Sequence, residues 1–296
     1  MDRKVKIMGI INLNDDSFYS GSRCPGSAFG HRLETMLNDG ADIIDLGAVS
    51  SRPGAAFADI EEEWRRLREP LEIIKGFHLS SGSISIDTFR SEIVERAASL
   101  LGDSFIINDI SAGTGFVSTC NASRKKSFAK PGSFPRSESS PESNMLEFVG
   151  KYQFPYIAMH IKGTPQTMQA LCNYPNGVVN EVKQYFADFE KKALAYGIRD
   201  FIIDPGFGFA KTIEQNWELF NAIPELKQSS RKRILVGISR KSMIYKPLGI
   251  TPEQSLEASV KANIKAAELG ADIIRVHDIV PTIKSLRSHF QRNAIV

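Results

Sequence analysis

The chain has 296 residues, a formal net charge of +3, 42% hydrophobic residues and three cysteines. The charge is too small to indicate nucleic acid or a membrane surface as a partner, and no apolar run approaches the ~20 residues of a membrane-spanning helix. Cys24, Cys120 and Cys172 lack the spacing of a metal site, and the first residues, MDRKVKIMGIINLNDDSF, lack the apolar core of a signal peptide, so we expect free thiols in a cytoplasmic protein.

Eight short apolar runs of the kind found in parallel strands buried on both faces recur along the chain. We place them at residues 5–11, 42–47, 83–87, 105–108, 155–160, 200–204, 233–238 and 272–276. Helix-length amphipathic stretches separate them. This alternation predicts an α/β fold, a single-domain (β/α)8 TIM barrel that spans residues 1–296.

Several of the intervening helices have recognisable ends. Asp59 is expected to cap a helix over residues 61–77, and Pro70 is expected to kink or split that helix. Gly102, Gly197 and Gly270 follow three later amphipathic stretches and predict where these helices end.

Residues 118–143 break the pattern. They are rich in Ser, Pro, Lys and Arg and have little apolar periodicity, which predicts a disordered insertion in the loop after the fourth strand. A solvated spacer without a role is the simpler interpretation. The alternative is that Arg124, Lys125, Lys126 and Lys130 attract an anionic substrate.

A polar or charged group follows each apolar run, and in a barrel such groups converge at the carboxyl ends of the strands. The groups are Asn12, Asp45, Asp87, Asn108–Asp109, His160, Asp204, Ser239–Lys241, and Arg275 with His277. Asp87, Asn108 and Asp204 together suit a planar heterocycle that carries an amino group and ring N–H donors. The alternative is that they pair with neighbouring Lys or Arg residues inside the barrel. Three such groups at strand ends, with Lys241 as a counter-charge, favour a ligand.

A second set of strand-end groups is cationic. Arg52 follows the second run, Lys241 the seventh, and Arg275 and His277 close the eighth. Guanidinium groups match the geometry of phosphate, and barrels often bind phosphate near strands seven and eight, which predicts a phosphorylated or diphosphorylated substrate. The alternative is that Arg275 and His277 form ordinary salt bridges with Asp272 or Asp278.

Eight motifs at these strand ends resemble those of the dihydropteroate synthase family, and the resemblance covers most of the chain apart from residues 118–143. The motifs are MGIINLNDDSF, GAVSSRPGA, SIDTF, INDISAG, MHIKGTPQTMQ, IDPGFGFAK, GISRKS and RVHD. The resemblance implies a transferase of folate biosynthesis that condenses 6-hydroxymethyl-7,8-dihydropterin diphosphate with p-aminobenzoate, giving 7,8-dihydropteroate and diphosphate. It also implies a Mg²⁺ cofactor, inhibition by sulfonamides and a homodimer.

The same resemblance implies roles for the residues at matching motif positions. The pterin would be bound by Asp87, Asn108, Met159, Asp204, Phe209 and Lys241. The diphosphate would be bound by Asn12, Ser51, Arg52, Arg275 and His277, with Asn12 also the Mg²⁺ ligand. The p-aminobenzoate would be bound by Phe18, Ser51, Pro53, Lys241 and Ser242. Catalysis would depend on Asn12, Asp16, Lys241, Arg275 and His277.

The first loop departs from the family pattern. Asn14-Asp15 stands where Thr-Pro is usual, and Ser20 stands where an acidic residue is common, so Asp15 or Asp16 becomes the candidate carboxylate for stabilising a pterin cation. Two alternatives stay open. One is a methyltetrahydrofolate-binding methyltransferase barrel, which should lack the SRK and RxH anion groups. The other is a non-catalytic pterin-binding barrel.

Overall fold

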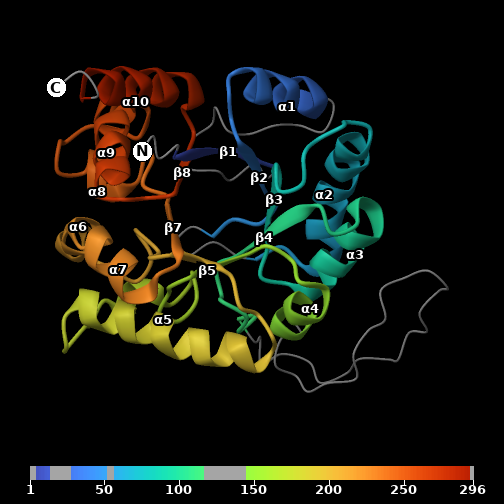
Figure 1. Cartoon of the computed structure of the whole chain (residues 1–296), viewed down its shortest axis with the longest axis horizontal. Helices are drawn as coiled ribbons and strands as arrows, with labels where there is room; N and C mark the ends of the chain where they lie inside the picture. The colour runs from blue at the N-terminus through green and yellow to red at the C-terminus, as the bar shows by residue number, and fades with distance from the viewer. Residues whose placement is uncertain (1–4, 14–27, 52–56, 117–144, 294–296) are drawn as a thin grey trace.

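The computed structural model describes residues 5–13, 28–51, 57–116 and 145–293. Eight parallel strands close into a barrel in which each strand pairs with the next and β8 pairs with β1 (Figure 1). They are β1 (Lys6–Asn12), β2 (Ile43–Gly47), β3 (Ile84–Asp87), β4 (Phe105–Asp109), β5 (Tyr156–Met159), β6 (Ile202–Asp204), β7 (Arg233–Val236) and β8 (Ile273–Val276). The predicted (β/α)8 barrel is confirmed, and each predicted strand overlaps an observed one.

The helices lie outside the barrel (Figure 1). The α-helices are α1 (Phe29–Asn38), α2 (Ile60–Lys75), α3 (Ser91–Leu101), α4 (Met145–Tyr152), α5 (Val178–Ala195), α6 (Ile213–Asn221), α7 (Ile223–Ser230), α8 (Ser242–Tyr245), α9 (Leu256–Glu268) and α10 (Ile279–Asn293). Two short 3-10 turns, η3 (Met168–Leu171) and η4 (Glu253–Ser255), lie in loops.

The predicted helix ends are largely confirmed. The Asp59 side chain accepts a hydrogen bond from the Glu62 backbone N–H at 2.8 Å, which caps α2. Helices α3, α5 and α9 end just before the predicted glycines, all of which have positive φ. The expectation that Pro70 could split α2 is wrong: Pro70 lies inside one continuous helix, on the buried face that also carries Leu67 and Leu71. Burial of this face compensates for the hydrogen bond that proline removes.

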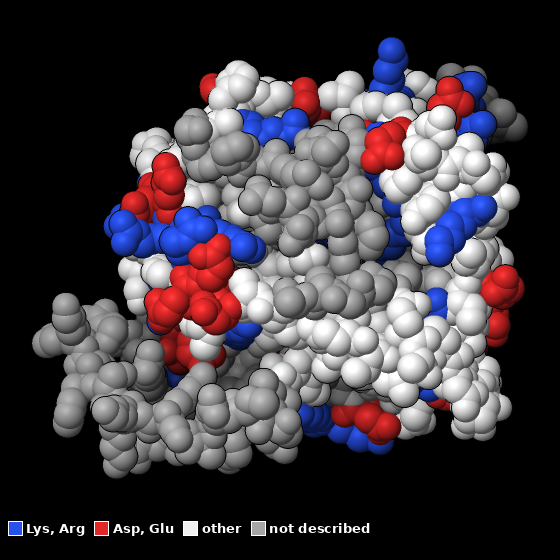
Figure 2. Space-filling model, turned by 180° about the vertical axis from the view of Figure 1, so that it is seen from behind, with Lys and Arg blue, Asp and Glu red and all other residues white. Residues whose placement is uncertain are grey.

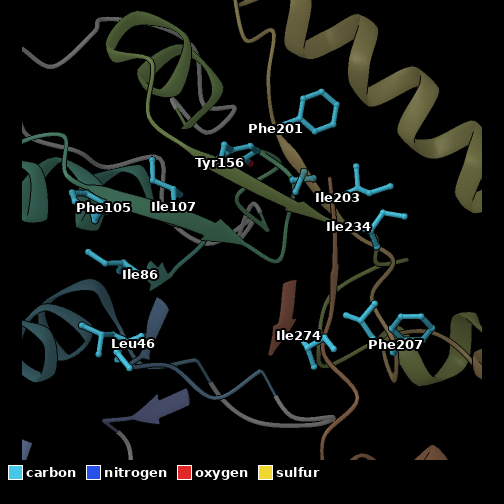
Figure 3. Packing of buried hydrophobic residues seen from close by; sticks show 14 of the residues in the cluster. Leu46, Ile86, Phe105, Ile107, Tyr156, Phe201, Ile203, Phe207, Ile234 and Ile274 are labelled. Atoms are coloured by element: carbon cyan, nitrogen blue, oxygen red, sulfur yellow. The ribbon is translucent and has the colours of Figure 1, made fainter. Parts of the chain in front are cut away.

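The alternation of side chains along the strands produces two apolar layers. Leu46, Ile86, Ile203 and Ile274 belong to the large cluster that packs the barrel against its helices (Figure 3). A separate cluster fills the barrel interior and consists of Met8, Ile43, Ile106, Ile157, Ile202, Leu235 and Ile273. Because residues two apart on a strand share a face, the side chain two positions further along points inward above this plug. The residues so placed are Asp45, Asn108, Met159, Asp204 and Arg275.

Within the described part of the chain, no helix is both long enough and apolar enough to cross a membrane. Acidic and basic side chains are interspersed over the described part of the face shown in Figure 2. The predicted insertion at 118–143 falls outside the described residues, between the end of β4 at Asp109 and the start of α4 at Met145.

Candidate active site at the barrel mouth

The structure describes most of the predicted site residues, and it places them at the carboxyl ends of the strands. Four of them, Asp16, Phe18, Arg52 and Pro53, lie outside the described residues, as does Asp15. The described residues are those predicted to bind the pterin and most of those predicted to bind the diphosphate, together with Ser242.

An ionic network crosses the mouth of the barrel. Arg275 in β8 donates from Nε to Asp45 Oδ2 at 2.7 Å and from Nη2 to Asp87 Oδ2 at 3.2 Å. Asn108 in β4 donates from Nδ2 to both oxygens of Asp45, at 3.3 and 3.2 Å. The Asp45 side chain is fully buried. The predicted residues Asp87, Asn108 and Arg275 are therefore brought together around a carboxylate in β2.

Asp45 is a strand-end residue for which the sequence predicted no specific role. The signal was present: Asp45 lies two positions after Ile43, in the inward register of the second strand. An inward carboxylate above an apolar plug requires a partner, because an isolated buried charge is costly. Arg275 and Asn108 meet that requirement.

The alternative pairings inferred from the sequence have mixed outcomes. Asp87 does pair with an arginine inside the barrel, Arg275. The suggestion that Asp272 or Asp278 binds Arg275 is wrong, because Asp272 is bound by Lys227 and Asp278 by Arg240. Both aspartates lie outside the inward register that carries Arg275 into the barrel mouth.

Burial controls the ionisation of the two carboxylates that face the site. It raises the pKa of Asp87 to about 7, with the nearby Asp45 carboxylate acting in the same direction and Arg275 opposing it. Burial also raises the pKa of Asp204, while Lys241 and the Gly206 backbone N–H oppose that rise. Both groups can therefore change their hydrogen-bonding capacity when a ligand with ring N–H donors arrives.

Lys241 lies in the loop after β7, the strand that pairs with β8. Its Nζ donates to the Phe207 carbonyl oxygen at 2.6 Å and lies 4.8 Å from the centre of the Phe209 ring. Burial lowers the pKa of Lys241 to about 8, although Asp204 acts in the opposite direction. Met159 and Phe209 belong to one apolar cluster at the mouth, so two predicted walls of the pterin pocket lie together, beside the predicted polar pair Asp204 and Lys241.

His277 differs from the cationic role expected of it. Burial lowers its pKa to about 3, and the charges of Arg275 and Arg240 act in the same direction. The ring is therefore neutral near pH 7, and its Nδ1 lies 3.2 Å from the Ser239 hydroxyl oxygen. The charge at this end of β8 is therefore carried by Arg275, beside a neutral His277 ring.

Arg240, in the middle of the SRK motif, is an anchor for the loop after β7. It binds both carboxylate oxygens of Asp278, at 2.8 and 2.9 Å, and donates to the carbonyl oxygens of Pro252 and Glu253. A bidentate guanidinium contact fixes both distance and orientation. The Arg240 contacts fix the loop in which Lys241 lies at the mouth, and α8 begins at the next residue, Ser242.

Gly47 lies between Asn12 and Asp87, at the ends of neighbouring strands. A Cβ atom at Gly47 would lie 3.4 Å from Asn12 Oδ1 and 3.8 Å from Asp87 Oδ2. No group of three or more His, Cys, Asp or Glu residues in the described ranges could hold a metal ion. Mg²⁺ that is bound with phosphates needs only one or two protein oxygens, so the Asn12 amide oxygen fits a Mg²⁺ ion that arrives with a diphosphate.

The comparison with known proteins identifies the family. The family of pterin binding enzymes matches residues 8–277, a range that runs from β1 to the residue just beyond β8. The dihydropteroate synthase of Synechocystis sp. is 35% identical over 288 residues, which is 94% of this chain and 86% of that protein. The chain belongs to the dihydropteroate synthase family.

Solved structures from the family share the fold. The dihydropteroate synthase of Yersinia pestis, solved with a sulfonamide drug complex, has a TM-score of 0.80 and 29% identity, covering 98% of this chain and 94% of that one. The Thermus thermophilus enzyme, solved with 4-aminobenzoate, has a TM-score of 0.75 and 29% identity, covering 98% of this chain and 95% of that one. These dihydropteroate synthases thus share the barrel fold of this chain, whose residues 8–277 match the pterin binding enzymes.

Proposed function

We propose that this chain joins 6-hydroxymethyl-7,8-dihydropterin diphosphate to p-aminobenzoate, releasing diphosphate and 7,8-dihydropteroate. The observation that carries the proposal is the convergence at one barrel mouth of the Arg275 network with the Asp204, Lys241 and Phe209 side. A pterin diphosphate has a polar ring edge, a flat apolar face and an anionic tail, and each has a counterpart there.

The pterin is held by groups that converge from five strands. We assign its amino and ring N–H groups to Asp87, Asn108 and Asp204, and its carbonyl oxygen to Lys241. The flat faces pack between Met159 and Phe209, which belong to one apolar cluster. Because these polar groups are largely buried, a ligand that left them unpaired would be penalised, which gives selectivity for the matching ring edge.

The diphosphate is assigned to Asn12, Ser51, Arg52, Arg275 and His277. Arg275 uses Nε and Nη2 to bind Asp45 and Asp87, so Nη1 is the donor that we assign to the diphosphate. The carboxylates fix the guanidinium plane before substrate binds, which reduces the reorganisation needed during reaction. We assign Mg²⁺ to Asn12; when bound, it would neutralise charge on the departing diphosphate.

The reaction breaks the C–O bond between the pterin methylene and the diphosphate, which leaves with the electron pair. The aromatic amine of p-aminobenzoate forms the new C–N bond and loses a proton to water. Phe18, Pro53, Ser51, Lys241 and Ser242 are assigned to p-aminobenzoate, and Asp16 to stabilisation of the pterin cation. The side chains orient both substrates and keep water from attacking the methylene carbon.

The proposal also includes inhibition by sulfonamides and the oligomeric state of the protein. The relatives solved with a sulfonamide and with 4-aminobenzoate support the view that sulfonamides compete for the p-aminobenzoate position. We also propose a homodimer in the cytoplasm, with no nucleic-acid or membrane partner. The methyltransferase and non-catalytic alternatives are not favoured, since the matched relatives are dihydropteroate synthases and the SRK and RVHD motifs are both present.

A diphosphate-release assay with both substrates and Mg²⁺ tests the proposal. We expect release only when p-aminobenzoate is present, and we expect Arg275→Met to abolish it. Arg233→Met is a matched control, because Arg233 forms an exposed pair with Asp200 outside the mouth. Absence of p-aminobenzoate-dependent release from the folded chain would contradict the proposed function.

A further inference from the structure

The loop after β6 contains a buried amine that the proposed chemistry does not use. Lys211 is 5% exposed, and its Nζ lies within hydrogen-bonding distance of three acceptors. It donates to the carbonyl oxygens of Gly206 and Phe209, each at 3.0 Å, and its distance to His160 Nδ1 is 2.9 Å. A lysine ammonium has three N–H donors, so this cradle can satisfy all of them.

His160, which directly follows β5, is suited to accept that hydrogen bond. Its side chain is buried, and burial lowers its pKa well below the usual value, with Lys211 acting in the same direction. The neutral ring accepts at Nδ1 when its proton is on Nε2, and the contact with Lys211 favours that tautomer. The ring also packs edge-on against Tyr185, with centroids 4.8 Å apart. Lys211 therefore links the β6 loop to a fixed side chain at the end of β5.

Two further hydrogen bonds join the loop after β5 to the loop after β6 and to the first turn of α6. The Tyr174 hydroxyl donates to the Ala210 carbonyl oxygen at 3.0 Å, and Gln215 Nε2 donates to the Cys172 carbonyl oxygen at 3.0 Å. The backbones also touch, because a Cβ atom at Gly206 would lie 1.9 Å from the His160 carbonyl oxygen. The two loops thus form one packed unit.

This unit carries one side of the pterin pocket. Met159 immediately precedes His160, Phe209 lies within the Lys211 cradle, and the Phe207 carbonyl oxygen accepts from Lys241. We propose that Lys211 is a positioning residue for the pterin pocket, which acts through His160 and the two carbonyl groups to fix Phe209 and Lys241 opposite Met159. This inference rests on the proposed function.

The position is an unfavourable one for a lysine that serves packing alone. Burial lowers the pKa of Lys211 to about 7, although Asp204 acts in the opposite direction. A methionine has similar length and no charge, so it would fill the same space without the free-energy cost of desolvating an ammonium group. It would, however, leave His160 and the two loop carbonyls without this donor.

Lys211→Met tests the inference, with Lys192→Met on the exposed face of α5 as the matched control. Each folded variant is titrated with 6-hydroxymethylpterin by calorimetry, and Michaelis constants are measured for both substrates. We expect Lys211→Met to weaken pterin affinity and raise the Michaelis constant for the pterin diphosphate by roughly tenfold or more, with a clearly smaller rise for p-aminobenzoate, whose assigned site shares only Lys241 with this unit. The control should match the unmutated chain in every measurement.

An equal rise for both substrates, or an unchanged pterin affinity in folded Lys211→Met, would overturn the inference. If Lys211→Met does not fold, Tyr174→Phe removes a single hydroxyl from the same pair of loops. Weaker pterin binding by Tyr174→Phe supports the loop clamp, and unchanged binding overturns it. Failure of the unmutated chain to bind the pterin would instead overturn the proposed function.

Discussion

Arg275 in β8 and Asp45 in β2 form a buried ion pair, with Nε and Oδ2 at 2.7 Å, although the strand β1 lies between theirs in the barrel. The pair therefore crosses the interior face of the mouth. Asn108 contacts the same carboxylate from β4. Asp45 thus holds in place both Arg275, which we assign to the diphosphate, and Asn108, which we assign to the pterin.

Asp45→Asn should destabilise the fold and also impair substrate binding. Breaking one side of a buried ion pair typically costs about 3–5 kcal/mol, and Arg275 would lose its fixed orientation. Thermal unfolding should show a clear fall in Tm, and the Michaelis constant for the pterin diphosphate should rise. Asp200→Asn is the control, because Asp200 forms an exposed pair with Arg233 and its substitution should change Tm little. Equal effects of the two substitutions would contradict the role assigned to Asp45.

Asp204→Asn should weaken pterin binding with only a small loss of stability. The substitution keeps the shape of the side chain but replaces one carboxylate oxygen by an N–H donor, which would face the donors of the pterin ring at a loss of about 1–3 kcal/mol. Calorimetry with 6-hydroxymethylpterin measures the change, and thermal unfolding measures stability. A variant that binds the pterin as tightly as the unmutated chain would show that Asp204 does not contact the ring.

Pterin affinity should pass through a maximum between the pKa values of Asp87 and Lys241. As pH falls through about 7, Asp87 gains a proton and loses acceptor capacity. As pH rises through about 8, Lys241 loses its proton and its charge. Affinity should therefore fall on both sides.

Calorimetry across this range measures the profile in the unmutated chain and in Lys241→Met. The variant should keep the acidic limb and lose the alkaline limb that Lys241 causes. A profile whose alkaline limb is the same in both proteins would show that another group is responsible for it.

The sequence predicted the barrel because each strand is a continuous apolar run that ends in a polar residue. It also predicted that Asp87, Asn108, Asp204 and Arg275 would converge, since polar groups at the carboxyl ends of barrel strands meet at one mouth. The Asp45–Arg275 pair could not be predicted in the same way. Its members are 230 positions apart, and their contact depends on the stagger of strands around the barrel.

Ionisation was the other property that the sequence could not supply. His277 was expected to be a cationic group from its residue type and its place beside Arg275. Burial lowers its pKa to about 3, and burial depends on the packing of the whole mouth. The same holds for Lys211, whose acceptors come from its own loop and from His160 in the preceding one.

Removal of residues 118–143, with a short Gly-Ser linker in their place, should leave folding and most activity intact. Their composition does not support a packed core, and shortening a loop changes its closure entropy only slightly. A deletion extended through Val149 is the control, because Met145, Leu146 and Val149 of α4 are buried. Tm should be kept in the first variant and fall sharply in the second.

A selective, salt-sensitive rise in the Michaelis constant for the pterin diphosphate after the shorter deletion would instead support attraction of the substrate by Arg124, Lys125, Lys126 and Lys130. A large fall in Tm after that deletion would show that the segment packs against the barrel.

The most direct test of the account is product analysis by mass spectrometry with isotopically labelled p-aminobenzoate, pterin diphosphate and Mg²⁺. Transfer of the pterin methylene to the aromatic amine predicts that the label appears in 7,8-dihydropteroate, in an amount equal to the diphosphate released. Diphosphate release with all of the label still in p-aminobenzoate would show that water is the acceptor, and would contradict the proposed transferase.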